Sequence, residues 1–115
     1  MINTVQQDLK GMYNIICNTV SVDCIYLFGS YANGIPNKDS DYDICVIVPD
    51  SEIRTVDMIK QIRHALFDVQ TKAIDLLVYH KSDFQQKSER ASFERQIARE
   101  GIVLRYEWMV CFSKE

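Results

Sequence analysis

Hydrophobic residues recur at helical spacing in two parts of the chain. The first stripe has steps of three and four residues and consists of Ile2, Val5, Leu9, Met12 and Ile16. Such steps place side chains on one face of an α-helix. Thr4 and Gln7 have the spacing of a capping box, so we predict a first helix over residues 4–19. A second stripe predicts a helix over residues 51–68 and consists of Ile53, Val56, Ile59, Ile62 and Leu66.

Three continuous apolar runs predict β-strands, because they are too short for helices of ordinary length. They are "CIYLF" at 24–28, "DICVIV" at 43–48 and "AIDLLVY" at 73–79. Gly29 ends the first run, whose strand we expect to be buried on both faces. A short helical turn is expected to start at Ser30 and to end at Gly34 and Pro36.

The last third of the chain is less regular. Phe84 and Phe93 are nine residues apart, so one straight helix with about 3.6 residues per turn would place them on opposite faces. We therefore predict a break within residues 87–92, followed by a helix that runs to Glu100 and stops at Gly101.

Two further patterns complete the predicted fold. Ser82 and Gln85 have capping-box spacing at the start of the helix that holds Phe84, and "IVLRYE" at 102–107 predicts a short last strand. Strands interleaved with helices predict an α/β or α+β layered fold. The 115 residues suit a single domain over residues 1–115.

Composition limits the kinds of partner. The chain is 47% hydrophobic and 25% charged, as in ordinary globular proteins, and its net charge is -3. This balance argues against bulk nucleic-acid binding, which needs a basic surface, but leaves room for a small phosphorylated ligand held by a metal. No signal-peptide pattern and no apolar run of about 20 residues occurs, so we expect a cytoplasmic protein without a membrane segment.

The four cysteines and two histidines predict no metal site. No cysteine pair has CxxC spacing, which favours buried free thiols in a reducing cytosol at Cys17, Cys24, Cys45 and Cys111. His64 and His80 are isolated, and we expect them on a helix surface and at a strand end. Neither a GxxxxGK[ST] loop nor a GxGxxG motif is present.

Three acidic residues are placed unusually for strands. Asp41 and Asp43 project to the same side of one strand, about 6.6 Å apart at Cα, and Asp75 lies inside another. If these strands are neighbours, the three carboxylates converge and repel one another. Mg²⁺ relieves such repulsion, and two ions about 3.5–4 Å apart can activate an attacking oxygen and stabilise a leaving phosphate.

The Gly-Ser pair before these acids suits a phosphate group. Gly29 has no side chain, so a ligand can approach the backbone closely. Ser30 opens a turn whose N–H groups, if helical, face an anion, and its hydroxyl can donate to a phosphate oxygen. A phosphate pocket beside a two-metal site indicates nucleoside triphosphate chemistry.

Gly29-Ser30, ten residues, and then Asp41-x-Asp43 resemble the signature of the DNA polymerase β-like nucleotidyltransferases, and most of all their MNT-type minimal members. The resemblance extends to "KAIDLLV" at 72–78, where the family places its third carboxylate, and to "IAREGIVL" at 97–104. It implies a short mixed sheet backed by helices. It also implies that a nucleoside monophosphate is transferred and pyrophosphate released.

The resemblance assigns roles to these residues. Gly29 and Ser30 would contact the triphosphate, Asp41 and Asp43 would bridge two Mg²⁺, and Asp75 would bind the catalytic metal and help to deprotonate the acceptor hydroxyl. Many relatives have a basic residue at the position of Asn33. Lys38 is the candidate to supply that charge to the nucleotide-binding pocket.

The acceptor is expected to come from another chain. The chain ends about ten residues after its last predicted strand, which leaves no room for an acceptor domain. Minimal nucleotidyltransferases pair with HEPN-domain proteins, so the resemblance implies the antitoxin of a toxin–antitoxin module that transfers AMP from ATP to a tyrosine of the toxin. Two alternatives stay open: a non-catalytic antitoxin that binds and covers its partner, and a catalytic subunit that adenylylates a small molecule.

An apolar tail follows the last predicted strand. Its large side chains are Tyr106, Trp108, Met109, Val110 and Phe112. The tail either completes the core or forms a surface for a partner or for self-association.

Overall fold

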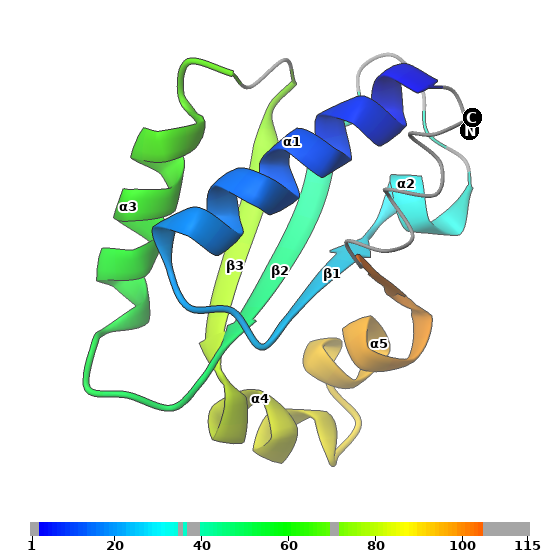
Figure 1. The fold of residues 1–115 in the computed structure, drawn as a ribbon. Helices are drawn as coiled ribbons and strands as arrows, with labels where there is room; N and C mark the ends of the chain where they lie inside the picture. The colour runs from blue at the N-terminus through cyan, green and yellow to red at the C-terminus, as the bar shows by residue number, and fades with distance from the viewer. Residues whose placement is uncertain (1–2, 35, 37–39, 70–71, 105–115) are drawn as a thin grey trace.

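The computed structural model describes residues 3–34, 36, 40–69 and 72–104. The elements follow one another as α1 (Asn3–Thr19), β1 (Cys24–Phe28), α2 (Ser30–Asn33), β2 (Tyr42–Val48), α3 (Thr55–Leu66), β3 (Ile74–His80), α4 (Lys81–Ser88), α5 (Phe93–Glu100) and β4 (Ile102–Val103). The predicted layered α/β fold with a short mixed sheet is confirmed (Figure 1).

The four strands form one sheet in the order β3-β2-β1-β4. β1 pairs antiparallel with both β2 and β4, whereas β2 and β3 are parallel. A parallel pair needs a crossover connection, and α3 supplies it between β2 and β3. This arrangement makes β2 a central strand, and every residue from Ile44 to Val48 is buried.

Helices cover the two faces of the sheet, because side chains alternate along each strand. Figure 1 shows α1 lying across the sheet with α3 beside it. Their apolar stripes pack with Ile25, Leu27 and Ile44, among others, to form the larger core. The opposite face carries a smaller core in which Phe84 of α4 and Ile97 of α5 pack on Cys45 and Ile47. The alternate residues of β1 on that face are only partly buried, so its burial is less complete than predicted.

The second predicted helix is shorter than its stripe of apolar residues. α3 begins at Thr55 and ends at Leu66, so the boundaries 51 and 68 are wrong. Ile53 is 56% exposed and Val56 44%, whereas Met58, Ile62 and Leu66 are buried. Ile53 belongs to the loop before the helix, where its backbone forms hydrogen bonds with other parts of the chain.

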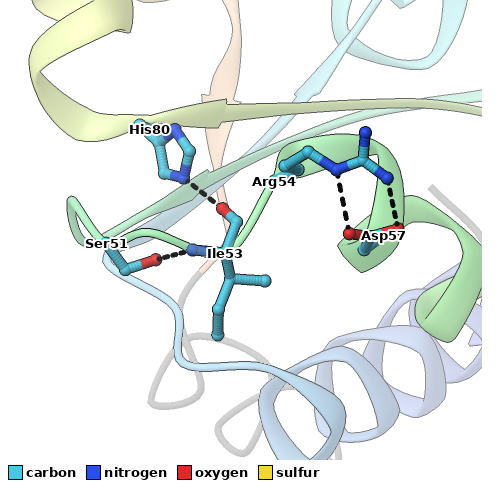
Figure 2. A network of polar contacts seen from close by, with 5 residues as sticks. All are labelled: Ser51, Ile53, Arg54, Asp57 and His80. Atoms are coloured by element: carbon cyan, nitrogen blue, oxygen red, sulfur yellow. Dashed lines mark hydrogen bonds and ion pairs between the residues drawn. The ribbon is translucent and has the colours of Figure 1, made fainter.

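Figure 2 shows how that loop is held. The Ile53 carbonyl oxygen lies 2.8 Å from His80 Nε2 at the end of β3; a carbonyl only accepts, so this ring nitrogen carries the hydrogen. The Ile53 N–H donates to Ser51 Oγ, and Arg54 pairs with Asp57 across the first turn of α3. His80 therefore lies at a strand end, as predicted, with Nε2 engaged by the backbone.

The predicted capping box at Ser82 and Gln85 is wrong. α4 begins at Lys81, so Ser82 lies inside its first turn. The Ser82 N–H instead donates to Asp50 Oδ1 at 3.0 Å. The cap comes from the loop after β2, far away in sequence. Hydrogen bonds from the backbone and side chain of Ser82 lower the pKa of the Asp50 carboxyl, because they stabilise its charged form.

The predicted break after α4 is confirmed. α5 starts at Phe93, and the Ser92 side chain caps it by accepting a hydrogen bond from the Arg95 N–H at 3.1 Å. Gly101 is its C-cap, as expected. The strand that follows covers Ile102–Val103, shorter than the predicted 102–107, and its last predicted residues and the apolar tail lie outside the described residues.

Two smaller points concern cysteines and membranes. Cys17 is a free thiol but is exposed, which corrects the prediction of burial, because it falls on the outer side of α1. Cys45 is buried as predicted, whereas Cys24 is only partly covered. Cys111 lies outside the described residues. Among the helices of the described part, none is long and apolar enough to cross a membrane.

Candidate active site

Two of the predicted acids meet at one end of the sheet. Asp43, near the start of β2, is paired in register with Asp75 on β3 and with Phe28 on β1. Side chains alternate along a strand, so Asp43 lies on the same face of the sheet as Cys45, and Asp75 lies on the same face as Leu77. α4 and α5 cover this face. The sequence predicted that the carboxylates of Asp41, Asp43 and Asp75 converge if their strands were neighbours. The parallel β2–β3 pair confirms that condition and places Asp43 beside Asp75.

The electrostatics of the pair are unfavourable for two charges. The pKa of Asp43 is raised, first by burial and then by the negative charges of Asp75 and Asp41 and by a hydrogen bond to Asp75. Asp41 precedes β2 and is exposed, so it acts on Asp43 mainly through its charge. Asp43 therefore holds its proton more readily than an isolated carboxyl does.

Gly29 brings backbone against the Asp43 carboxylate. It has φ of 73° and ψ of -149°, a conformation that side chains disfavour. A Cβ at this position would also overlap Asp43 Oδ2. Both constraints explain why a glycine separates β1 from α2. The predicted helical turn at Ser30 is confirmed as α2, which Gly34 ends in the left-handed conformation.

Aromatic packing fixes α2 and the start of β2 relative to each other. Tyr31 and Tyr42 are both buried, and their ring centroids are 4.7 Å apart. The Tyr42 hydroxyl donates to Asp8 Oδ2 on α1 at 2.9 Å. Because Tyr31 follows Ser30 and Tyr42 lies between Asp41 and Asp43, this packing positions the Gly-Ser turn beside the acids.

A cavity of about 320 Å³ opens beside the paired carboxylates. Gly29, Asp43 and Asp75 line it on the sheet side. The opposite wall is one face of α5, formed by residues at helical spacing: Phe93, Gln96, Ile97 and Glu100. A second cavity of about 380 Å³ lies at the other end of the sheet near Val48 and Met58, and its lining contains no carboxylate.

Polar contacts hold α5 in place as the wall of the first cavity. The Tyr79 hydroxyl on β3 donates to Glu94 Oε2 at 2.7 Å. This bond lowers the pKa of Glu94 and, after burial, contributes to raising that of Tyr79. Lys87 lies over the Tyr79 ring, 5.5 Å from its centroid. Tyr79 and Asp75 lie on the same face of β3, so Asp75 and the wall are fixed to the same strand.

The donor set suits Mg²⁺, which takes oxygen ligands and commonly one or two carboxylates completed by water and substrate phosphates. Asp43 and Asp75 provide such a pair, and their mutual repulsion favours a cation. Within residues 3–34, 36, 40–69 and 72–104, no group of three or more His, Cys, Asp or Glu side chains is arranged to hold a metal. The two carboxylates alone would leave most positions around such an ion to other oxygen ligands.

Three other positions were named from the sequence. Lys38 lies outside the described residues, and Asn33 ends α2. His64 is on the exposed side of α3, as predicted. The α5 wall of Phe93, Gln96 and Glu100 was not predicted from the sequence. Their spacing was visible, but only the fold shows that this helix face lies opposite Asp43.

Most of the chain matches a known protein family. Residues 11–107 match the family described as Polymerase beta, Nucleotidyltransferase, and the chain belongs to that family. The match includes the Gly29-Ser30 turn and all three predicted acids. No match was found among curated proteins.

Solved structures show the same fold at low sequence identity. A nucleotidyltransferase from Sulfolobus solfataricus is 15% identical with a TM-score of 0.60, covering 85% of this chain and 77% of its own. A toxin–antitoxin structure with AMP-PNP is 20% identical with a TM-score of 0.53, covering 93% and 86%. A mutant of the toxin–antitoxin MntA-HpeT is 18% identical with a TM-score of 0.52, covering 90% and 85%.

Proposed function

We propose that this nucleotidyltransferase is Mg²⁺-dependent and transfers AMP from ATP to a hydroxyl group of a partner protein. The acceptor is a tyrosine of a HEPN-domain toxin, and the chain is the antitoxin of that pair. The observation that carries the catalytic part is the register of Asp43 opposite Asp75, with Gly29 against the Asp43 carboxylate. The similarity to toxin–antitoxin structures, one of them with AMP-PNP, supports the biological setting.

The roles proposed for the residues are those that the family resemblance implies. Asp41, Asp43 and Asp75 would hold Mg²⁺, which when bound supplies positive charge to the triphosphate and to the leaving pyrophosphate. Gly29 lets the triphosphate approach the backbone, and Ser30 donates its hydroxyl to a phosphate oxygen. Lys38 is proposed to add positive charge to this pocket.

Asp75 accepts the proton of the acceptor hydroxyl as attack begins. The acceptor oxygen forms a bond to the α-phosphorus while the bond from that phosphorus to the bridging oxygen breaks. Pyrophosphate leaves with the electron pair of the broken bond. The products are the AMP ester of the acceptor and pyrophosphate.

A mass measurement tests this proposal. The purified chain is incubated with a cognate HEPN-domain partner, Mg²⁺ and ATP, and the intact mass of the partner is measured. We expect the mass of the partner to increase by the mass of one or more AMP groups attached to tyrosine. The increase should require Mg²⁺. It should not occur when the chain carries both Asp41→Ala and Asp43→Ala. Asp83→Asn, an exposed acid on α4, is the matched control and should act like wild type. An unmodified partner in a stable complex with wild type would contradict the proposal.

A further inference from the structure

Tyr42 lies between two of the proposed metal ligands, Asp41 and Asp43, in the sequence. Side chains alternate along a strand, so Tyr42 and Asp43 project to opposite faces of the sheet. Asp43 lines the cavity beside α5, whereas Tyr42 is 1% exposed and packs in the larger core on the α1 side. Tyr42 therefore lies behind the site, on the far face of the same strand, where a ligand in the cavity does not touch it.

Contacts from three parts of the chain hold Tyr42 in place. Its N–H donates to the Ala73 carbonyl oxygen at 3.0 Å, which joins the start of β2 to the residue before β3. Its ring centroid lies 4.7 Å from that of Tyr31 on α2, and its hydroxyl donates to Asp8 Oδ2 on α1 at 2.9 Å. Backbone, ring and hydroxyl are thus each fixed to a different segment.

Two of these contacts join Tyr42 to segments that carry other proposed site residues. Ala73 is two positions before Asp75, and Tyr31 directly follows Ser30. The backbone bond and the ring stack therefore position Asp75 and the Gly-Ser turn relative to β2. The hydroxyl contact is different, because α1 carries no predicted site residue and Asp8 belongs to no part of the motif.

Asp8 is the partner that the buried hydroxyl of Tyr42 needs. A tyrosine hydroxyl without a hydrogen bond, away from water, costs free energy. Asp8 is 34 positions away and is partly buried on α1, whose residues Val5, Leu9 and Met12 are anchored in the core. Burial, and then the bond to Asp8, raises the pKa of Tyr42, so its hydroxyl keeps the proton that it donates.

We propose that Asp8 is a positioning residue for metal binding, and that it acts through the Tyr42 hydroxyl to fix the segment that carries Asp41 and Asp43. The inference rests on the proposed metal chemistry and adds to it a residue outside the motif. Asp8 itself touches neither the metal nor the substrate. Groups that orient a metal ligand without touching the metal typically change metal affinity by about 10- to 100-fold when they are removed.

Repulsion between the acids makes such positioning necessary. Asp43 and Asp75 are register partners on neighbouring strands, and two negative charges there favour separation of the carboxylates. β2 begins at Tyr42, so the acids lie where the strand starts and can be displaced most easily. The Asp8 bond opposes this displacement. Mg²⁺ demands near-ideal octahedral geometry, so a small displacement of its ligands lowers its affinity.

A contact that only stabilises the fold would behave differently. Loss of the bond between Tyr42 and Asp8 would then lower the free energy of unfolding but leave ligand binding by the folded chain unchanged. A positioning role instead weakens binding that depends on the metal, in chains that are folded. Binding with and without Mg²⁺ therefore distinguishes the two roles.

Calorimetric titration of the full-length chain with inorganic tripolyphosphate, once in Mg²⁺ and once in a chelator, tests the inference. Tyr42→Phe keeps the ring but removes the donor. We expect it to weaken binding in Mg²⁺ by about tenfold and to leave binding in the chelator unchanged. Asp8→Ala should have the same effect, and the double variant should lose no more than either alone, because both changes remove one bond.

Two control variants separate the hydrogen bond from charge and from stability. Asp8→Asn removes the charge but keeps an acceptor oxygen, so it should bind as wild type does. Ile62→Val removes a methyl group from a fully buried residue of α3, which lowers stability without removing a polar contact. It should also bind as wild type does. Melting temperatures verify that every variant is folded at the temperature of the titration.

The outcomes separate this inference from the proposed function. Unchanged binding in Mg²⁺ for Tyr42→Phe and Asp8→Ala, or equal losses in Mg²⁺ and in the chelator, would overturn the inference alone. A loss in Asp8→Asn without one in Tyr42→Phe would also overturn it, because Asp8 would then act through its charge.

Two further outcomes concern the proposed function itself. Wild-type binding of tripolyphosphate that Mg²⁺ does not strengthen would overturn the proposed metal site and this inference with it. The expected pattern of binding, combined with no AMP transfer to any partner, would retain the inference and overturn the proposed reaction.

Discussion

Asp43 and Asp75 lie directly opposite each other on parallel neighbouring strands, although 31 positions separate them in the chain. The β2–α3–β3 crossover brings them together, and β1 adds Gly29 at the same end of the sheet. Like charges this close destabilise a folded protein unless a proton or a cation lies between them. The relationship therefore predicts both a cost in stability and a ligand that offsets it.

The first prediction concerns the stability cost. The pKa of Asp43 is raised, so between about pH 4 and that pKa the folded state binds more protons than the unfolded state. Its contribution to stability is therefore present at low pH and is lost as the pH rises through the folded pKa. We expect Asp43→Asn, without metal, to be more stable than wild type at about pH 8, with the difference vanishing near about pH 4.

Urea unfolding from acid to mildly alkaline pH, in the presence of a chelator, measures this difference. Addition of Mg²⁺ and ATP should reverse the order, because ligand binding stabilises wild type and not the variant. A variant that is less stable than wild type by the same amount at every pH would show that the carboxyl has a purely structural role.

The second prediction concerns Gly29. In Gly29→Ala the new Cβ would overlap the Asp43 carboxylate, and the residue would be held at a φ of 73°. Gly34→Ala has a similar φ of 81° but no atom within 4 Å of the new Cβ, so it isolates the backbone strain. We expect both to lose about 1 kcal/mol or more of unfolding free energy.

Only Gly29→Ala should also lose affinity for Mg²⁺ and ATP, because it displaces a carboxylate of the site. Calorimetric titration of both variants at a temperature where they are folded makes the comparison. Equal losses of nucleotide affinity would mean that the close approach of Gly29 to Asp43 has no part in binding.

The sequence predicted the acids better than their surroundings. Asp43 begins one apolar run and Asp75 interrupts another, where an uncompensated charge is costly, so a local pattern was enough to single them out. The wall formed by Phe93 and Glu100 has no such mark, because exposed aromatic and acidic residues are ordinary on a helix. Its position depends on how α5 packs on the sheet.

The errors in the predicted elements have the same origin. Ile53 continues a helical stripe, but it lies in the loop before α3, and its carbonyl accepts a hydrogen bond from His80 at the end of β3. Ser82 and Gln85 have capping-box spacing, yet Asp50 provides the partner for the Ser82 N–H. Short-range patterns cannot anticipate a partner that the fold brings from about 30 residues away, whatever their local quality.

The third prediction concerns the bond from Tyr79 to Glu94. Tyr79→Phe removes its donor, and we expect a loss of about 1 kcal/mol of unfolding free energy, since Glu94 remains near solvent. Glu94→Ala removes the acceptor and should cost a similar amount, and the double variant should cost little more than either alone. Denaturant unfolding of wild type, the two single variants and the double variant gives the coupling free energy between the two side chains. Strictly additive losses would show that the bond contributes nothing of its own.

The fourth prediction concerns the packing around Tyr42. Tyr42→Phe keeps the stack with Tyr31 but removes the hydroxyl that donates to Asp8. We expect a loss of about 1–2 kcal/mol, because the hydrogen bond is with an acidic side chain and is partly buried. Denaturant unfolding measures it. Unchanged stability would mean that ring packing alone holds α1 and α2 beside the acids.

The most direct test of the account is the melting temperature of wild type and Asp41→Ala with ATP, with Mg²⁺, and with both. A ligand that binds the native state raises the melting temperature by mass action. We predict a large rise for wild type only when both are present, and none for Asp41→Ala, which removes an exposed carboxylate at the edge of the site. A rise of the same size in both proteins, or no rise in wild type, would contradict a metal–nucleotide site at these acids.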